Sequence, residues 1–449
     1  MVTDYIVAIY LGTSHLVGMV GKKNSRGALS IVAEEVKESS GCIRRGRIHN
    51  VAETAARIKR LVLELQNRLP NLRIEKVYIG IGGQSLRSID HSEVRTIRAD
   101  AFVTEDDIRL LNEQCKNYRP EMSDVLAVAP PVYYLDDKRT SNPVGVSCRR
   151  IEARYKLVVG QPIIRKSIIN SIEQQASITV AGIIVSPLAL AEAILTRNEK
   201  ELGCAVIDFG AGVTSIVVYK NGHLAYLGVM PLGSDLITRD LTSLRLVEAE
   251  AERLKITYGN AKPNENQEGS ISLDTVDGIG TRKINLSEID MVVEARAKEI
   301  VQNVYARIEE SKLANALGAG IVLVGGGAAL KNLQELVRET FKLQEVRYST
   351  IRKGLVDDAG DKVGDPRYMS ALSLLLQGTE SCVGAIRRKQ EEPTPPPVQP
   401  VEPVKEPETE PERIIPEREE EPQPKPRPQK RGGLFGGFGR IARGLFDEE

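Results

Sequence analysis

Two segments of the chain share one pattern of apolar and polar residues: an apolar run, a glycine-centred turn and a second apolar run. In residues 204–220 the first run ends on Asp208, Gly210 and Gly212 lie in the turn, and β-branched residues follow. This composition predicts two strands joined by a tight turn, with Asp208 at its tip. Glycine there would let backbone N–H groups approach a phosphate, and the carboxylate could hold a metal ion directly or through water. An ordinary hairpin with a hydrogen-bonded aspartate explains this segment alone equally well.

The same layout occurs in residues 7–20, so the chain contains an internal repeat. Gly12 aligns with Gly210, and each copy is followed by a polar glycine turn and another strand-like run. In this alignment Tyr10 stands where the second copy has Asp208. Two similar lobes whose hairpins face each other would hold a polyphosphate between them, and repetition is more specific than a single glycine-rich loop. The duplicated plan resembles the actin-like ATPase superfamily, which implies an α/β fold of two ribonuclease-H-like lobes.

Residues 84–160 do not belong to the repeated plan. Their pattern predicts a small α+β insert of one strand, one helix and two long strands. These elements are expected at residues 86–96, 104–118, 124–135 and 149–159. Thr104 and Asp107 provide the start signal of the helix. Because the segment has no phosphate loop and no cluster of titratable groups, we expect a docking module rather than a catalytic one.

The remaining elements follow from helical and strand periodicity. A helix is predicted at residues 50–69, where apolar residues recur at helical spacing. The second lobe is expected to begin with a helix at 162–175 and a strand at 179–185. A long helix is predicted at 287–316, whereas residues 261–285 are polar and poor in strand signals.

Two features beyond the second hairpin could bind an adenosine. A predicted helix carries Glu252 and Lys255 three residues apart on one face, although an exposed ion pair is the commoner explanation of such a pair. Residues 320–330 predict a buried strand that runs into a glycine loop containing Gly326 and Gly327. This loop follows the second phosphate loop at the point where an adenine-binding loop would be needed.

Composition excludes several classes of function. The 449 residues carry no net charge and 41% are hydrophobic, which is enough for two lobes with their own cores. The five cysteines are scattered without a close pair, which favours reduced thiols over disulfides or a zinc site. No signal peptide precedes Val7 and no apolar run reaches about 18 residues, so we expect no membrane-spanning helix. No basic domain with interleaved aromatic residues occurs, so nucleic acid is not an expected partner.

The character of the chain changes near its C-terminus. Residues 391–429 are one third proline with many glutamates, so we expect an extended, disordered spacer. Residues 431–446 then show apolar positions at helical spacing together with arginines that could face lipid head groups. The apolar positions are Leu434, Phe435, Phe438, Ile441, Leu445 and Phe446, and the basic ones are Arg440 and Arg443. We expect an amphipathic helix on an anionic membrane; the alternatives are a partner-binding helix and an inert tail.

The motifs taken together are similar to those of the FtsA family of bacterial cell-division proteins. The similar stretches cover nearly the whole chain: GTSHL (12–16), the insert, PLGSDLITRDL (231–241), EAERLKITYG (250–259), IVLVGGGAALKNL (321–333), RYMSALSLLL (367–376), and the proline-rich spacer with its amphipathic end. The resemblance implies a filament-forming protein that binds ATP and Mg²⁺. It also implies that the chain tethers the tubulin-like division protein FtsZ to the cytoplasmic face of the inner membrane at the division site. Later division proteins are further implied partners.

The family resemblance also assigns two interaction regions. It implies that the insert drives longitudinal self-assembly into filaments. It further implies that the region around the helix at 287–316 binds the C-terminal peptide of FtsZ, with Arg296 as the matching basic residue.

The residues expected at the nucleotide come from the two turns, from the stretch after the second hairpin and from the third glycine loop. They are Gly12, Thr13, Ser14, Asp208, Gly210, Gly212, Thr214, Gly233, Glu252, Lys255, Gly326 and Gly327, with Asp208 as the one metal-facing acid. Three residues depart from the pattern of relatives: Tyr10 replaces a usual Asp, His15 a frequent Lys, and Ser186 a Glu or Gln that orients water. We therefore expect nucleotide binding with weak or no ATP hydrolysis.

Five parts are expected along the chain. They are a first actin-like lobe at 1–83, the insert at 84–160, a second lobe at 161–388 from which some C-terminal segments could return to the first, a disordered linker at 389–430 and an amphipathic helix at 431–449. A kinase or ATPase on the same fold would need metal acids and a group that orients the nucleophile, and the chain lacks candidates for both. The actin-like component of type IV pilus assembly is the alternative within this fold, although that family does not typically end in a long proline-rich linker and an amphipathic helix.

Overall fold

The internal repeat appears in the structure as two sheets with one strand order. The computed structural model describes residues 5–24, 27–39, 41–98, 101–263, 269–274, 281–357 and 360–385, all within the unit formed by residues 1–388. The predicted linker and the C-terminal amphipathic segment, with its eight membrane-facing candidates, lie outside the described residues.

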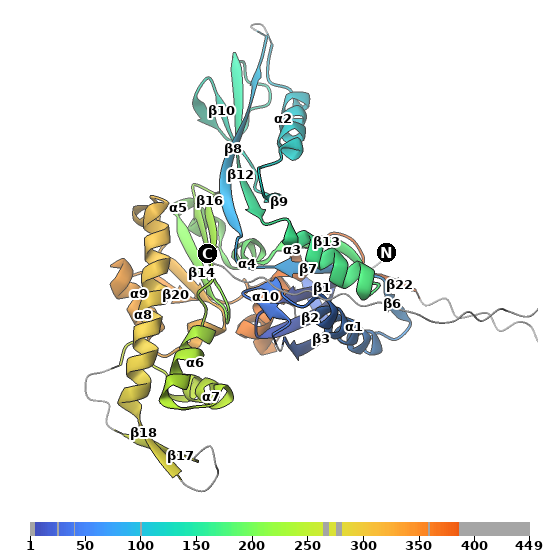
Figure 1. The fold of residues 1–449 in the computed structure, drawn as a ribbon. Helices are drawn as coiled ribbons and strands as arrows, with labels where there is room; N and C mark the ends of the chain where they lie inside the picture. The colour runs from blue at the N-terminus through green and yellow to red at the C-terminus, as the bar shows by residue number, and fades with distance from the viewer. Residues whose placement is uncertain are drawn as a thin grey trace, which may run out of the picture. The chain divides into compact units, whose positions relative to one another are not determined.

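The first sheet has six strands in the order β13-β7-β1-β2-β3-β21. Their bounds are β1 (Tyr5–Leu11), β2 (His15–Lys23), β3 (Leu29–Glu38), β7 (Lys76–Ile81), β13 (Thr179–Val185) and β21 (Val356–Asp357). β1, β2 and β3 pair antiparallel, whereas β1, β7 and β13 pair parallel. This sheet forms the centre of the first lobe (Figure 1).

The second sheet contains the same five-strand core as the order β16-β15-β14-β19-β20. The bounds are β14 (Cys204–Phe209), β15 (Thr214–Lys220), β16 (His223–Met230), β19 (Ile321–Val324) and β20 (Val346–Tyr348). Here too the first three strands are antiparallel and the last three parallel. The predicted duplicated two-lobe α/β fold is confirmed.

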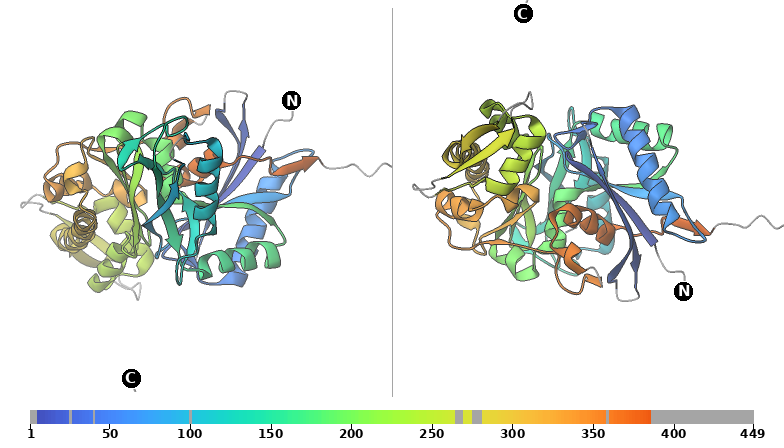
Figure 2. Two further views of the ribbon diagram at one scale, coloured as in Figure 1. Left: turned by 90° about the horizontal axis from the view of Figure 1, so that it is seen from above. Right: turned by 90° about the horizontal axis from the view of Figure 1, so that it is seen from below.

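Two helices cover the first sheet on opposite faces, as Figure 2 shows: α1 (Val51–Asn67) and α10 (Pro366–Gln377). Asn50 caps α1 by accepting a hydrogen bond from the backbone N–H of Glu53. A Cβ on Gly18 would meet Leu61 of α1, and a Cβ on Gly80 would meet Leu374 of α10. Both sides of the sheet are therefore closely packed, which explains why β1 and β2 are almost continuously apolar.

The insert extends the second sheet at its β16 edge (Figure 1). Its elements are β8 (Arg87–Thr96), α2 (Glu105–Asn117), β9 (Asp124–Val128), β10 (Val132–Leu135), β11 (Lys138–Thr140) and β12 (Arg150–Gly160). The predicted capping box of α2 is present, since Thr104 and Asp107 bond each other's backbone N–H groups. The long strand expected at 124–135 is divided in two, because Pro130 and Pro131 interrupt it.

The expected start of the second lobe at residue 161 does not agree with sheet membership. After the insert the chain forms α3 (Ile163–Ile168), a π-helical segment (Ile169–Gln175) and β13, and β13 pairs with β7 of the first sheet. C-terminal segments also return to the first lobe and complete it, which is the possibility stated in the sequence analysis. There β21 pairs with β3, α10 packs on β1 and β2, and β22 (Val383–Ala385) pairs with β6 (Leu72–Ile74).

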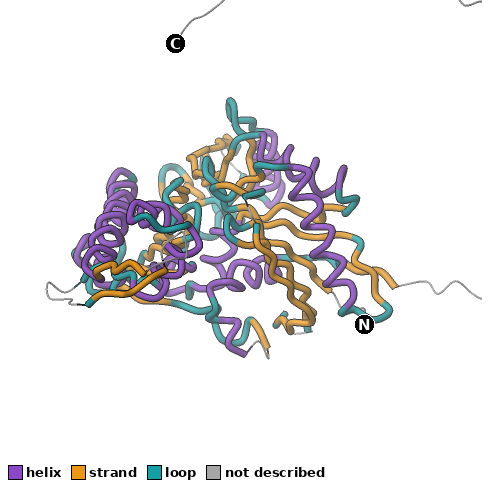
Figure 3. Tube along the Cα trace, turned by 60° about the horizontal axis from the view of Figure 1, so that its bottom comes forward, coloured by secondary structure: helices purple, strands orange, loops and turns teal. Residues whose placement is uncertain are grey.

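The helices of the second lobe form one group at the left of Figure 3, and a small hairpin lies next to them. The group comprises α6 (Asp235–Leu241), α7 (Glu248–Tyr258), α8 (Leu286–Glu310) and α9 (Leu333–Phe341). The predicted long helix ends at Glu310 rather than at 316, because the chain continues as a 3-10 turn (Ala314–Ala316). The segment expected to be poor in strands contains the hairpin of β17 (Ser270–Asp274) and β18 (Thr281–Asn285), so that prediction is wrong.

The remaining short elements connect these parts. They are the hairpin strands β4 (Ile43–Arg44) and β5 (Arg47–Ile48), the helices α4 (Ser186–Ile194) and α5 (Arg197–Leu202), and three 3-10 turns (Thr242–Leu244, Gly326–Ala329 and Gly360–Val363). The described part of the chain includes no helix that is both long and apolar enough to cross a bilayer. All five cysteines are buried free thiols.

Candidate functional site

Two neighbouring cavities lie between the lobes, and both touch the glycine turns of the repeat. The first, here called cavity A, has a volume of about 450 Å³ and is lined by residues of β1, β14, α7, α10 and the third glycine loop. The second, cavity B, has a volume of about 1220 Å³ and is lined by the β4–β5 hairpin, α6 and α7. Thr13, Ser14 and Ala211 belong to the lining of both cavities, so the two turns separate them.

The structure brings most of the predicted nucleotide residues to these cavities. Those that line cavity A are Gly12, Thr13, Ser14, Asp208, Gly210, Glu252, Lys255, Gly326 and Gly327. Gly212 and Gly233 line cavity B instead. Residues that are far apart in sequence thus converge on one place, and their contact with a nucleotide stays a prediction.

Thr214 is the one predicted nucleotide residue that the structure does not bring to either cavity. It begins β15, is fully buried, and donates its hydroxyl hydrogen bond to the carbonyl of Leu232 at 2.6 Å. The side chain of the first strand residue points into the lobe, so the hydroxyl supports the fold instead of facing a phosphate.

The two turns have the same backbone geometry and approach each other closely. The N–H of Gly12 donates to the carbonyl of His15, and the N–H of Gly210 donates to the carbonyl of Val213, each at 3.0 Å. A Cβ on Gly212 would lie 2.5 Å from the hydroxyl oxygen of Thr13, so glycine is required for the two turns to meet. The turns can therefore place backbone N–H groups of both lobes around one polyphosphate.

Asp208 is the carboxylate of this arrangement. Burial raises its pKa to about 6, and no hydrogen bond or ion pair of its carboxylate is present among the described residues. A carboxylate in this position is stabilised when a cation approaches. The described residues contain no group of three or more potential protein ligands for a metal ion. A single buried carboxylate beside the two turns fits an ion such as Mg²⁺, which takes few protein ligands and completes its shell with phosphate and water oxygens.

Tyr10 occupies the position in β1 that Asp208 occupies in β14. Its side chain lies beside Ser370 of α10, and burial together with the charge of Asp208 raises the pKa of the phenol. Tyr10 is therefore neutral at physiological pH and offers no charge to a metal ion. The first lobe keeps the turn but lacks the acid.

Glu252 and Lys255 form the ion pair that their spacing predicts, and the ammonium is buried rather than exposed. Lys255 Nζ donates to Glu252 Oε2 at 2.7 Å, to Thr238 Oγ1 at 2.9 Å and to the carbonyl of Ser234 at 3.3 Å. These bonds fix α7 against α6 at the wall of cavity A. The pair can orient a ligand there because both side chains are held in place.

Sequence reasoning did not identify several residues that line cavity A. Asp235 and Lys331 lie within stretches similar to the FtsA family, so their neighbourhood was the available signal. Arg367 and Ser370 come from α10, which reaches the cavity only because it packs on the first sheet. These two also lie in a stretch similar to the FtsA family (367–376), but no local pattern connects that stretch with the cavity.

Ser186 and Arg296 have surroundings that bear on their predicted roles. Ser186 is buried, its hydroxyl has no partner among the described residues, and it lines neither cavity. Arg296 of α8 is held by Asp240 of α6, through Nε at 2.5 Å and Nη2 at 3.2 Å, and by Glu299. This arginine therefore joins two helices, and its use by a partner stays a prediction.

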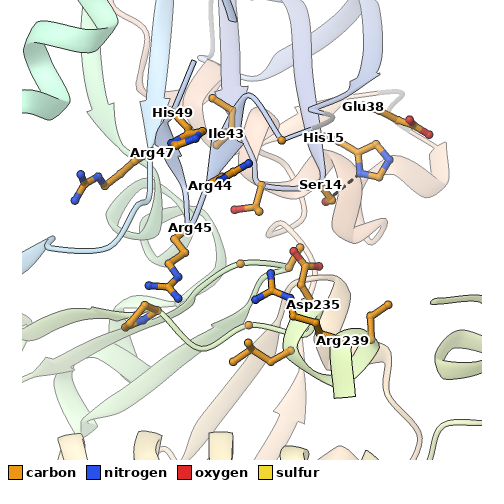
Figure 4. Close-up of a pocket in the computed structure, with 18 of the residues that line it drawn as sticks. Ser14, His15, Glu38, Ile43, Arg44, Arg45, Arg47, His49, Asp235 and Arg239 are labelled. Atoms are coloured by element: carbon orange, nitrogen blue, oxygen red, sulfur yellow. Dashed lines mark hydrogen bonds between the residues drawn. The ribbon is translucent and has the colours of Figure 1, made fainter. Parts of the chain in front are cut away.

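Figure 4 shows the side chains around cavity B. Arg44, Arg45 and Arg47 come from the β4–β5 hairpin of the first lobe, and Arg239 comes from α6 of the second. Beside the first turn, the imidazole of His15 is hydrogen-bonded to the hydroxyl of Ser14 at 3.1 Å. Cavity B is thus lined by basic groups from both lobes.

Comparisons with known proteins identify the family that the chain resembles. A family model described as "Cell division protein FtsA" matches residues 205–373, and one described as "SHS2 domain inserted in FTSA" matches residues 83–159. The cell division protein FtsA of Porphyromonas gingivalis is 34% identical over 394 residues, which cover 86% of this chain and 80% of that protein. The FtsA of Neisseria meningitidis serogroup B is 31% identical over 382 residues, which cover 83% and 89% of the two chains.

Among solved structures, the fold is similar to a chain of the "PilM-PilN type IV pilus biogenesis complex". The TM-score is 0.59 at 17% identity, and the match covers 84% of this chain and 98% of that chain. At this identity the similarity concerns the fold alone.

Proposed function

The chain belongs to the FtsA family of cell division proteins, and on that premise we propose that it is an ATP- and Mg²⁺-binding filament protein that anchors the FtsZ ring. It would act at the cytoplasmic face of the inner membrane at the division site, with later division proteins as further partners. The observation that carries the nucleotide part of this proposal is the convergence of both glycine turns, Asp208 and the Glu252–Lys255 pair on cavity A.

Each part of cavity A has a role in this proposal. The backbone N–H groups of the two turns bind the phosphates, and Asp208 orients Mg²⁺ directly or through water. Bound Mg²⁺ neutralises phosphate charge. Lys255, Glu252, Gly326 and Gly327 surround the adenosine. A ligand that contacts both turns holds the two lobes together, because each turn belongs to a different sheet.

The same site favours binding over turnover. Phosphoryl transfer depends on metal-holding acids and on a group that orients the attacking water. Tyr10 provides no carboxylate, and the hydroxyl of Ser186 does not reach either cavity. Ground-state contacts are retained while transition-state contacts are missing, so we propose weak or no hydrolysis. Nucleotide then acts as a ligand that stabilises a filament-competent protein.

The interaction surfaces are proposed from the family. The insert would provide the longitudinal contact, and its attachment at the β16 edge leaves the duplicated core intact if it is removed. The region around α8, including Arg296, would bind the C-terminal peptide of FtsZ. Residues 431–449, with Phe435 and Phe438 among their apolar positions, would attach the protein to anionic lipid.

A role in type IV pilus assembly is the second candidate, because the PilM–PilN structure has the same fold. The 34% identity to an FtsA over most of both chains favours the division protein.

Sedimentation of the purified full-length chain tests the proposal. We expect it to sediment with FtsZ filaments and with anionic liposomes. Phe435→Glu with Phe438→Glu should release it from liposomes only, and deletion of residues 84–160 should abolish filaments on lipid while nucleotide binding remains. Wild-type protein that ignores FtsZ filaments would refute the anchoring role, and filaments of normal repeat from the deletion variant would refute the role of the insert.

A further inference from the structure

Cavity B is placed where it can receive a phosphate that extends beyond the turns. The residues that line both cavities are Thr13, Ser14, His15, Ala211, Asp235 and Glu252, so the two spaces meet at the phosphate loops and beside α6 and α7. A polyphosphate held in cavity A by these loops would direct its terminal phosphoryl group toward cavity B.

Two guanidinium groups face cavity B from opposite lobes. Figure 4 shows Arg45, from the β4–β5 hairpin, and Arg239, from α6, pointing into the same space. Neither side chain forms an ion pair with any residue that the structure describes, whereas the neighbouring Arg47 is hydrogen-bonded to Gln161. Like charges that face each other across a cleft oppose its closure, and an anion between them would reverse the sign of that interaction.

The hairpin that carries Arg45 is held by bonds on both sides. The N–H of Gly46 donates to Thr13 Oγ1 at 2.9 Å, which fixes the hairpin to the first phosphate loop. The carbonyl of Arg45 accepts from the N–H of Gln84 at 3.0 Å, and Arg47 Nη1 donates to Gln161 Oε1 at 2.8 Å. Arg45 also has a left-handed backbone (φ 49°). Its Cα position is thus determined before any ligand binds, which lowers the entropic cost of using its side chain.

Four acids line cavity B, namely Glu38, Asp235, Glu248 and Glu252, and in the described part of the chain none of them forms an ion pair with Arg45 or Arg239. Glu252 is engaged by Lys255 and by the hydroxyl of Thr238. Asp235 belongs to α6, as Arg239 does, and burial raises the pKa of its carboxyl group, which weakens it as a counter-charge. Arginine binds phosphate through parallel N–H bonds, and a phosphoryl group has enough oxygens to accept them from two guanidinium groups at once.

We propose that cavity B is a phosphoryl-binding site in which Arg45 and Arg239 close on one phosphate from opposite lobes. The proposal rests on nucleotide binding in cavity A. The phosphate is either the terminal phosphate of ATP or free phosphate beside bound ADP, and both sources present the same chemistry to the two arginines.

Calorimetric titration of the full-length chain with Mg²⁺ and ADP, or with Mg²⁺ and the non-hydrolysable ATP analogue AMPPNP, tests this site. Arg45→Gln and Arg239→Gln should each weaken AMPPNP binding about tenfold, equivalent to about 1.4 kcal/mol, and leave ADP binding unchanged. Arg60→Gln and Arg253→Gln are matched controls, because these exposed arginines line neither cavity. Arg45→Lys should restore part of the loss, since a lysine keeps the charge without the bidentate geometry.

A second titration separates the two sources. If free phosphate is the ligand, inorganic phosphate should bind the ADP-loaded wild type, and the two variants should lose that binding while their AMPPNP affinity stays unchanged. If neither AMPPNP nor phosphate binding changes in the variants while ADP still binds, the phosphoryl site is refuted and the proposed nucleotide function stands. A wild type that binds neither ADP nor AMPPNP would refute the proposed nucleotide function itself.

Discussion

The two lobes present the same turn to the same cavity but differ at one position. β1 and β14 have equivalent neighbours in their sheets, and the closing hydrogen bonds of the two turns are each 3.0 Å long. The penultimate residue is Tyr10 in one strand and Asp208 in the other. The turn geometry is thus independent of the acid, because backbone bonds and glycine determine it. A lobe can thus lack the carboxylate and still keep the glycine turn.

The largest expected effect is the difference in nucleotide affinity between variants of Asp208 and of Tyr10. Asp208→Asn should weaken nucleotide binding about 100-fold in Mg²⁺, equivalent to about 2.7 kcal/mol, and much less in EDTA, because the carboxylate acts through the metal. Tyr10→Phe removes only a neutral hydroxyl and should change the affinity little. Titration of both variants with and without Mg²⁺ is the measurement. An equal loss in both variants would mean that the lobes contribute alike.

The pH dependence of stability provides the next comparison. The folded-state pKa of Asp208, about 6, lies above the unfolded value of about 3.9, so its destabilising charge appears as the pH rises between these values. Relative to Asp208→Asn, the ligand-free wild type should therefore lose about 1.4 kcal/mol of unfolding free energy between pH 5 and pH 7.5. Urea unfolding at both pH values measures the difference. The difference between wild type and Tyr10→Phe should stay constant over this range, because burial keeps the phenol neutral.

A smaller effect is expected at Thr214, which aligns with Leu16 in the repeat. Both residues are fully buried, so Thr214→Val should cost about 1 kcal/mol for the lost bond to Leu232 and should leave nucleotide affinity unchanged. Thermal unfolding and nucleotide titration of the variant measure the two effects. If the variant loses nucleotide affinity while its stability is unchanged, the Thr214 hydroxyl contacts the phosphate and the structural role is wrong.

The smallest effect is expected from restoring the missing acid. Tyr10→Asp should raise phosphate release only a few-fold, because Ser186 lines neither cavity and cannot orient water there. Steady-state phosphate release in Mg²⁺ is the measurement, with Tyr10→Asn as the uncharged control. An equal rise in Tyr10→Asn would show that removal of the phenol ring, and not the added charge, increases phosphate release.

The fold could be predicted where a sequence pattern lies within one segment or is repeated along the chain. It could not be predicted where it depends on contacts between segments that are far apart in the sequence. The glycine turns and the offset that aligns Gly12 with Gly210 identified the duplicated fold. The same alignment places Thr214 on Leu16, so the repeat itself held the evidence against a hydroxyl at the phosphate. Likewise, Ile271 and Leu273 alternate with polar residues and are a strand signal that the polar composition of the segment obscured.

The rest of the site could not have been derived from local patterns. The position of Ser370 beside Tyr10 depends on the packing of α10 against a sheet formed much earlier in the chain. The pairing of β13 with β7 across the insert is a contact of the same kind. The convergence of Arg45 and Arg239 requires the relative placement of two lobes, which no sequence window contains.

The way the first sheet is completed has a consequence for how the protein is made. Synthesis proceeds from the N-terminus, yet α10 can pack on β1 and β2 only after residue 377 has been added. Likewise, β21 can pair with β3 only after residue 357 has been added. The five-strand core of the second lobe is contained within residues 204–348 and needs no earlier strand. Until α10 is available, the apolar face that it covers must be shielded by other means, which is the situation in which nascent chains depend on chaperones. The lobe that leaves the ribosome first is completed last.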